Sequence, residues 1–144
     1  MPLERDEELR ELLLRVRTIA VVGIKDGAGD DAFRVPRYMQ DHGYRILPVS
    51  PKLEQVLGER AVARLGDLTE PVDLVNLFRA PAHIPAHADE ILSLSPPPRA
   101  VWMQLGIRHA DAAARLEAAG IAVVEDRCLM VEHRRLLGRR AAGC

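Results

Sequence analysis

Short apolar runs alternate with longer amphipathic segments through most of this chain. Five of the runs have the length and composition of strands buried on both faces, and they occupy residues 18–23, 44–49, 72–78, 100–105 and 121–125. The segments between them have the length of helices, and alternation of this kind is typical of parallel βαβ units with right-handed crossovers. The sequence therefore predicts an α/β fold: a doubly wound, mostly parallel five-stranded Rossmann-like sheet with helices on both faces.

The segments outside the strands complete this prediction. Residues 1–17 are expected to form an amphipathic N-terminal helix, with acids early and arginines late, an order that suits the helix dipole. Asp30 or Asp31 is expected to cap the helix that follows the first strand. The region after residue 52 is less regular, with Val62 in a short strand or turn. We expect one domain over residues 1–144, with a frayed tail at 139–144.

Composition excludes several classes of protein. Apolar residues make up 48% of the chain and charged residues 28%, which is typical of a globular protein. The formal charge of -1 does not suit a protein that neutralises a nucleic-acid backbone. No apolar run approaches the roughly 20 residues that span a bilayer. Two cysteines, Cys128 and Cys144, form no disulfide framework. We therefore expect a cytoplasmic protein with neither a membrane nor a nucleic acid as partner.

Two lysines stand at corresponding places in the predicted fold. The chain has eighteen arginines and only two lysines, Lys25 and Lys52, and each follows directly after one of the first two strands. Ligands of parallel α/β sheets bind outside the carboxyl ends of the strands. The lysines therefore mark that edge of the sheet as the expected ligand site.

The loops at this edge favour a ligand with a phosphate on its ribose. A G-x-G-x-x-G motif would be expected for NAD, but residues 23–29 carry glycines at a different spacing. Lys52 stands where a dinucleotide site has an acid for the ribose hydroxyls, and an ammonium group prefers a phosphate. NAD is therefore disfavoured, and NADP or coenzyme A fits better.

Several segments then carry a resemblance to a known family. VVG at residues 21–23, GYRILPVSP at 43–51, VDLVNLFRAP at 72–81, VWMQLG at 101–106 and EDRCLMVEHR at 125–134 resemble, in order, the small coenzyme A-binding domain family. That family is similar to the nucleotide-binding first domain of the succinyl-coenzyme A synthetase α subunit. The resemblance implies coenzyme A binding on a Rossmann-like fold. It does not imply ligase activity, because the synthetase also needs a phosphorylatable histidine domain and an ATP-binding subunit.

The first loop departs from the family pattern. Lys25 stands where a small hydroxyl residue is common, and Ala28 and Ala32 replace proline and serine. Asp26, together with the two aspartates before the helix, adds negative charge where a helix N-terminus would attract phosphate.

Position and resemblance together give a set of candidate cofactor-binding residues. They are Gly23, Ile24, Lys25, Ser50, Pro51, Lys52, Phe78, Arg79, Gln104, Gly106 and Cys128. Backbone amides of the first loop are expected to hold the pyrophosphate and Lys52 a phosphate. For the rest, alternatives remain open. Arg79 faces the ligand or pairs with an acid, Gln104 meets the pantetheine amides or the backbone, and Cys128 is an inert thiol or lies near the thiol of the ligand.

No catalytic constellation is evident. Cys128 and His133 are five residues apart and do not share a helical face, and His83 and His87 have metal-ligand spacing without a third ligand. The leading hypothesis is non-catalytic binding of coenzyme A or an acyl-coenzyme A, with any protein partner left open. The alternatives are an NADP-linked redox enzyme or sensor, and an interaction module with a vestigial cleft.

Overall fold

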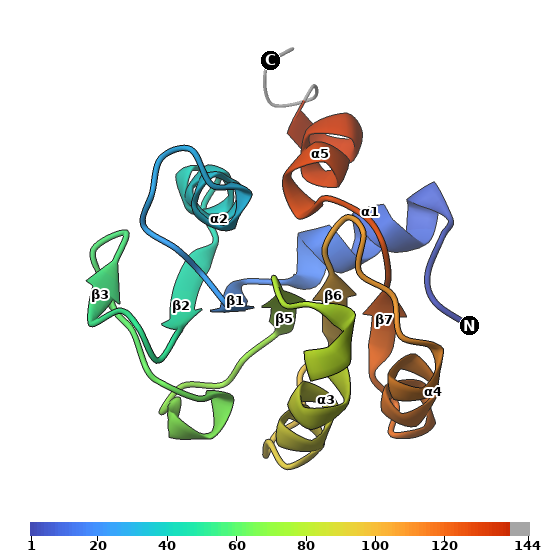
Figure 1. Cartoon of the computed structure of the whole chain (residues 1–144). Coiled ribbons are helices and arrows are strands. Elements are labelled where there is room, and N and C mark those ends of the chain that lie inside the picture. The colour runs from blue at the N-terminus through green and yellow to red at the C-terminus, as the bar shows by residue number, and fades with distance from the viewer. Residues whose placement is uncertain (139–144) are drawn as a thin grey trace.

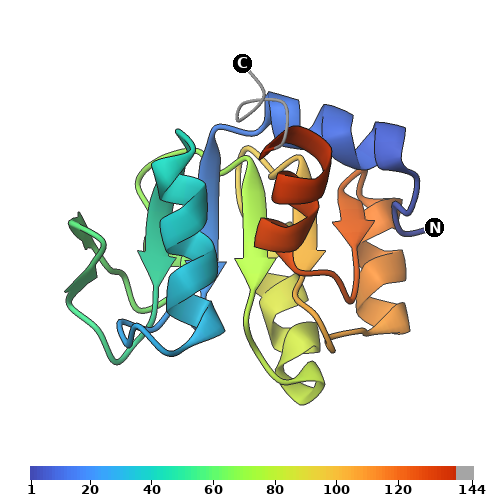
Figure 2. The same ribbon diagram turned by 90° about the horizontal axis from the view of Figure 1, so that it is seen from above.

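The computed structural model describes residues 1–138 and contains the predicted five-stranded sheet (Figure 1). Its strands are β1 (Thr18–Val22), β2 (Arg45–Val49), β5 (Leu74–Leu77), β6 (Ala100–Met103) and β7 (Ala122–Val124). The order in space is β2-β1-β5-β6-β7, and every neighbouring pair is parallel. The arrowheads accordingly point the same way in Figure 2. The predicted fold class is confirmed, and this sheet is entirely parallel.

Helices cover both faces of the sheet (Figure 1). One face carries α1 (Asp6–Arg15), α2 (Asp31–Asp41) and α5 (Leu129–His133), and the other carries α3 (Ile84–Leu92) and α4 (Ala110–Ala118). A 3₁₀ turn at Pro81–His83 precedes α3, and α5 continues into a π-helical turn at Arg134–Gly138. The predicted frayed tail, residues 139–144, lies outside the described residues. No helix among residues 1–138 is long and apolar enough to cross a membrane.

Each face of the sheet has its own apolar core because side chains alternate along a strand. Ile19 and Val21 of β1 pack under α1, α2 and α5, whereas Ala20 and Val22 pack toward α3 and α4. Trp102 is fully buried in the first of these cores, and its indole N–H donates to the carbonyl of Arg127 at 2.8 Å. This bond attaches the segment before α5 to the middle of the sheet.

A small hairpin lies beside the edge strand β2. Its strands are β3 (Gln55–Val56) and β4 (Glu59–Arg60). Leu57 and Gly58 form the turn with φ values of 54° and 77°, and Gln40 of α2 donates to the Leu57 carbonyl at 2.8 Å. Val62 then forms a parallel bridge with Val49. The region predicted to be irregular, with Val62 in a short strand or turn, therefore consists of this hairpin followed by an isolated strand bridge at Val62.

The order of the strands creates a switch point between β1 and β5. The chain moves outward from β1 to β2 and then returns to the other side of β1, where β5, β6 and β7 follow. In open parallel sheets ligands bind beside such a point, outside the carboxyl ends of the strands. The candidate residues follow these ends.

Candidate functional site

The loops that leave the five strands form one edge of the sheet, which we call the strand-end rim. It consists of residues 23–25, 50–52, 78–79, 104–106 and 125–128. All eleven candidate residues belong to it, because the strands are parallel and their carboxyl ends lie together.

Gly23 lies where the loops after β1 and β5 come closest. Its φ is +83°, and its N–H donates to the Val49 carbonyl at 3.0 Å. A Cβ at this position would lie 2.4 Å from the Phe78 carbonyl oxygen and 3.2 Å from Cδ of Arg79. Glycine is therefore required here both for the backbone conformation and for the close approach of the two loops.

The rest of the first loop combines a buried anchor with exposed charge. Ile24 is 2% exposed and packs into the core beneath α2, whereas Lys25 is exposed. Asp30 occupies the N-cap position of α2, as predicted, yet its side chain accepts no capping bond. Asp31 pairs with Arg34 one turn further along the helix. Part of the negative charge noted in the sequence is thus compensated within α2.

The exit of β2 is an ordered turn that presents Lys52. Ser50 is buried, its N–H donates to the Val62 carbonyl at 2.8 Å, and its hydroxyl accepts from the Lys52 N–H at 3.1 Å. Pro51 and Lys52 are exposed. The Ser50 hydroxyl is therefore engaged in shaping the turn, and Lys52 is the group of this exit that is open to a ligand.

The exit of β5 places Arg79 against α3. Phe78 is half-buried against the core under α2 and α5, and its N–H donates to the Val22 carbonyl at 2.9 Å. Arg79 donates from Nε to Nε2 of His87 at 3.2 Å, and Nδ1 of His87 lies 2.7 Å from a carboxylate oxygen of Glu90. The sequence left open whether Arg79 pairs with an acid. In the structure its direct partner is His87, and the acid Glu90 contacts the other ring nitrogen of that histidine.

Gln104, at the exit of β6, is part of a buried polar chain. Its Oε1 accepts from the Leu129 N–H at 2.9 Å and from Nδ2 of Asn76 at 3.3 Å. The Asn76 amide also donates to the Trp102 carbonyl, and Asn76 Oδ1 is a buried acceptor without a partner among residues 1–138. The side-chain carbonyl of Gln104 thus fixes the start of α5. Of the two roles that the sequence left open for Gln104, this is the contact with the backbone.

The exits of β6 and β7 are held together by Asp126. One carboxylate oxygen accepts from the Gly106 N–H at 2.6 Å and the other from Arg108 at 3.1 Å. The pKa of Asp126 lies below its usual value: the Gly106 N–H lowers it most, desolvation opposes this, and the contact with Arg108 lowers it further. Gly106, with φ +86°, permits the turn, and its N–H is directed to Asp126.

Cys128 lies at the N-terminal end of α5 and is partly buried. His133 is turned away from the rim, because its Nδ1 is 2.9 Å from the Tyr38 hydroxyl and its ring packs edge-on against Tyr38, His42 and Tyr44. Burial, and to a smaller extent His42, lowers the pKa of His133. These contacts join the lower part of α5 to α2 and give His133 a packing role.

A second polar network connects α5 with the N-terminal helix. Glu132 is 6% exposed and binds both Arg127 and Arg135, and Arg135 also binds Asp6 at 2.8 and 2.9 Å. Desolvation raises the pKa of Glu132, but the bonds from Arg135 and Arg127 outweigh it, so the pKa lies below its usual value. Neither arginine of this network is available to a ligand at the rim.

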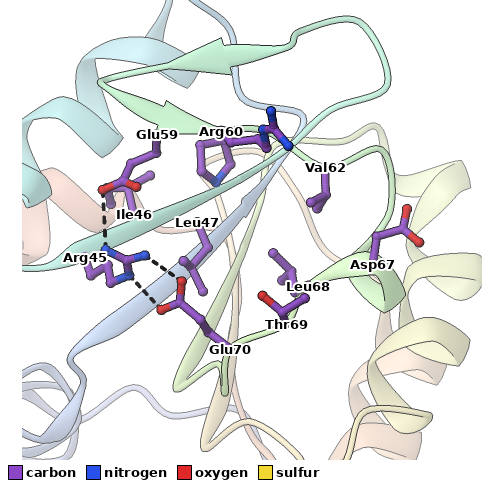
Figure 3. Close-up of a pocket in the computed structure, with 11 residues that line it drawn as sticks. Arg45, Ile46, Leu47, Glu59, Arg60, Val62, Asp67, Leu68, Thr69 and Glu70 are labelled. Carbon is purple, nitrogen blue, oxygen red and sulfur yellow. Dashed lines mark hydrogen bonds and ion pairs between the residues drawn. The ribbon is translucent and has the colours of Figure 1, made fainter.

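A pocket of about 400 Å³ lies along the outer edge of β2, away from the switch point (Figure 3). Arg45 stands at one side of it and forms ion pairs with Glu70 and Glu59, and the apolar side chains of Leu47 and Leu68 form part of its wall. Its charged lining residues are two arginines, Arg45 and Arg60, and three acids, Glu59, Asp67 and Glu70. The acids outnumber the arginines, which does not favour a phosphate.

The rim contrasts with this pocket in its electrostatics. Lys25, Lys52 and Arg79 follow three adjacent strands, and within residues 1–138 none of them forms an ion pair with a carboxylate. Two of these cations without an ion-pair partner follow the strands of the switch point and the third follows the neighbouring strand β2, an arrangement that suits an anionic ligand. The part of the chain that the structure describes holds no group of three histidine, cysteine or acidic side chains that could bind a metal ion.

Several groups that shape this site cannot be identified from the sequence. The sequence marks His87 only by its spacing to His83, and the contact of His87 with Arg79 depends on how α3 packs beside β5. Its i, i+3 spacing to Glu90 is visible in the sequence and is a contact distance on a helix. Asp126 and Asn76 give no sequence signal, because their partners are eighteen or more residues away along the chain.

Comparison with known proteins places this geometry among relatives. The CoA binding domain family matches residues 17–134. YneT of Bacillus subtilis (strain 168) is 37% identical over 126 residues, covering 88% of this chain and 92% of YneT. The structure of cell-free ID.343 from Thermus thermophilus is 48% identical with a TM-score of 0.88, covering 93% of this chain and 100% of that one. A hypothetical protein from Pyrococcus horikoshii OT3 is 34% identical with a TM-score of 0.89, covering 96% and 97%.

Proposed function

Since this chain belongs to the CoA binding domain family, we propose that it binds coenzyme A or an acyl-coenzyme A at the strand-end rim without acting on it chemically. The family match over residues 17–134 is the observation that carries the proposal, because it includes every residue of the rim. The proposal includes a cytoplasmic location and a small-molecule nucleotide as ligand. The resemblance of the chain to the succinyl-coenzyme A synthetase α subunit supports nucleotide binding and not ligation.

The position of the cations supports a particular orientation of the ligand. The diphosphate of coenzyme A would lie beside Gly23 at the switch point, where the two loops meet next to the side chain of Arg79. Lys25 and Arg79 flank this point. Lys52 follows the neighbouring strand β2 and would receive the phosphate on the adenosine ribose. The pantetheine arm would extend toward β6 and the start of α5, where Phe78 and Cys128 are partly exposed.

The same groups distinguish coenzyme A from NAD. NAD carries free ribose hydroxyls, for which a carboxylate acceptor would be expected at the exit of β2. That exit presents the ammonium group of Lys52 instead. NADP shares the additional ribose phosphate with coenzyme A, so an NADP-linked redox protein is the rival that the test must separate.

The test is a titration of the full chain with coenzyme A, dephospho-coenzyme A, NAD and NADP, followed by thermal unfolding and by calorimetry. A ligand of the folded state raises the unfolding temperature in proportion to RT ln(1 + [L]/Kd). Coenzyme A is expected to give the largest shift. Lys52→Ala is expected to weaken coenzyme A about tenfold, which corresponds to about 1.4 kcal/mol, and to leave dephospho-coenzyme A unchanged.

Arg99→Ala is the matched control. Arg99 is an exposed cation that precedes β6, at the opposite end of the sheet. Its removal changes the net charge as much as Lys52→Ala does and should not alter affinity. A larger shift with NADP would support the redox alternative. No shift with any of the four ligands would support an interaction module with a vestigial cleft.

A further inference from the structure

We propose that His87 and Glu90 of α3 are positioning residues that hold Arg79 against the diphosphate of the ligand. This inference rests on the proposed function, because it assigns a role at the same rim. It assigns to Arg79 the diphosphate and not the ribose phosphate. It also gives a function to the histidine that the sequence singled out only for its metal-ligand spacing.

The hydrogen bonds fix the protonation pattern of the three side chains. Nε of arginine can only donate, so Nε2 of His87, at 3.2 Å from it, must be the acceptor. The proton of neutral His87 then lies on Nδ1 and is donated to Glu90 at 2.7 Å. Glu90 thus fixes the tautomer of His87, and His87 in turn fixes the direction of the guanidinium.

This arrangement leaves the ligand-binding part of Arg79 unused. Only Nε is engaged, and neither terminal nitrogen donates to a group within residues 1–138. Among residues 1–138, Asn76 Oδ1 is the one fully buried side-chain polar atom without a hydrogen-bond partner. The terminal nitrogens of Arg79 have no partner either, so they are not fully buried. Two parallel N–H donors on a guanidinium match the oxygens of a phosphate.

The position of Arg79 favours the diphosphate. Its Cδ lies 3.2 Å from the place where a Cβ of Gly23 would be, so the side chain passes directly over the point at which the loops after β1 and β5 meet. Lys52 follows β2, on the other side of β1. Two cations separated by a strand in this way can bind two different phosphates of one ligand.

The contacts of His87 also argue against a metal site formed by His83 and His87. In a metal site Nε2 or Nδ1 would have to be free to bind the ion. Here one nitrogen accepts from Arg79 and the other donates to Glu90, and His83 is exposed outside α3. With a side chain only 16% exposed, His87 is placed to support another residue and not to meet a ligand itself.

The test measures dissociation constants for coenzyme A and dephospho-coenzyme A by calorimetry on the full chain. His87→Ala is expected to weaken both ligands by the same factor, about fivefold, because both contain the diphosphate. His87→Gln should restore affinity to within about twofold, since the glutamine oxygen can accept from Nε. In the Arg79→Ala background, His87→Ala should have no further effect, because interacting residues are not additive.

Two variants keep the result interpretable. Asp89 lies on α3, as His87 does, and pairs with Arg115 of α4. Asp89→Asn removes this ion pair without affecting the contacts of Arg79, and it should leave the affinities for coenzyme A and dephospho-coenzyme A unchanged. If His87→Ala does not fold, Glu90→Ala tests the same chain of contacts, because it removes the acceptor of the His87 Nδ1 proton, and it should weaken the binding of both ligands.

The opposing results are distinct. Unchanged affinity in His87→Ala, or an equal loss in the Arg79→Ala background, would overturn the role of His87. A loss restricted to coenzyme A would move Arg79 to the ribose phosphate and overturn the assignment. Failure of the wild-type chain to bind either ligand would refute the proposed function itself, and this inference with it.

Discussion

Replacing Gly23 by alanine should destabilise the fold by about 3 kcal/mol, a value that can be worked from the structure. The φ of +83° costs a residue with a Cβ about 1 kcal/mol. The new Cβ would lie 2.4 Å from the Phe78 carbonyl oxygen, and this neighbour is backbone that cannot rotate away. The loops after β1 and β5 must therefore separate. Distorting the adjacent 2.9 Å bond from Phe78 to Val22 costs about 1 kcal/mol more, with a similar amount for lost packing.

The assay is urea unfolding followed by tryptophan fluorescence. Trp102 is the single tryptophan of the chain and is fully buried, so its emission reports on the core. For a chain of this length, 3 kcal/mol corresponds to a fall in Tm of about 10 °C. An unchanged m-value would show that stability alone has changed.

Two other glycines separate the contributions. Gly43 has φ +95° with nothing within 4 Å of an added Cβ, so Gly43→Ala should cost only the conformational part, about 1 kcal/mol. Gly29 has neither a positive φ nor a close neighbour, and Gly29→Ala should be neutral or slightly stabilising. If Gly23→Ala costs no more than Gly43→Ala, the close approach of the two loops is refuted.

The remaining predictions concern α5. Burial lowers the folded-state pKa of His133. The contribution of neutral His133 to the free energy of unfolding should therefore be fully present above pH 6.5 and should be lost as the pH falls from there through the folded-state pKa. Urea midpoints between pH 7.5 and 5 measure this, and His133→Asn should flatten the curve; an equally steep curve would contradict the assignment. Glu132→Gln should cost about 2 kcal/mol by leaving Arg127 and Arg135 without their buried carboxylate, measured in the same way at pH 7. A loss below about 0.5 kcal/mol would show that solvent compensates the pair.

The strands were predictable because the local sequence determines them. Gly23 ends the first apolar run and Gly43 ends the helix before the second, so the predicted strands lie within a few residues of those observed. The hairpin was not resolved from sequence. Its strands have two residues each, and its turn places a leucine, Leu57, in a left-handed conformation that usually indicates glycine or asparagine.

The positions of the site residues were predictable, but their hydrogen bonds were not. A residue that follows a strand in a parallel sheet must lie at its carboxyl end, which placed Lys25 and Lys52 correctly at the rim. Whether such a residue is open to a ligand depends on partners far away in the chain. The Gly106 N–H donates to Asp126, and the side-chain oxygen of Gln104 accepts from the Leu129 N–H. Only the packed fold creates these contacts.

Coenzyme A binding at the switch point between β1 and β5 is the property on which the proposed roles of the rim residues depend. A titration of the ¹⁵N-labelled chain with coenzyme A, followed by amide chemical shifts, tests this most directly. We predict that the largest changes occur at Gly23, Lys25, Lys52 and Arg79. Changes gathered instead around Arg45, in the pocket at the edge of β2, would contradict the account.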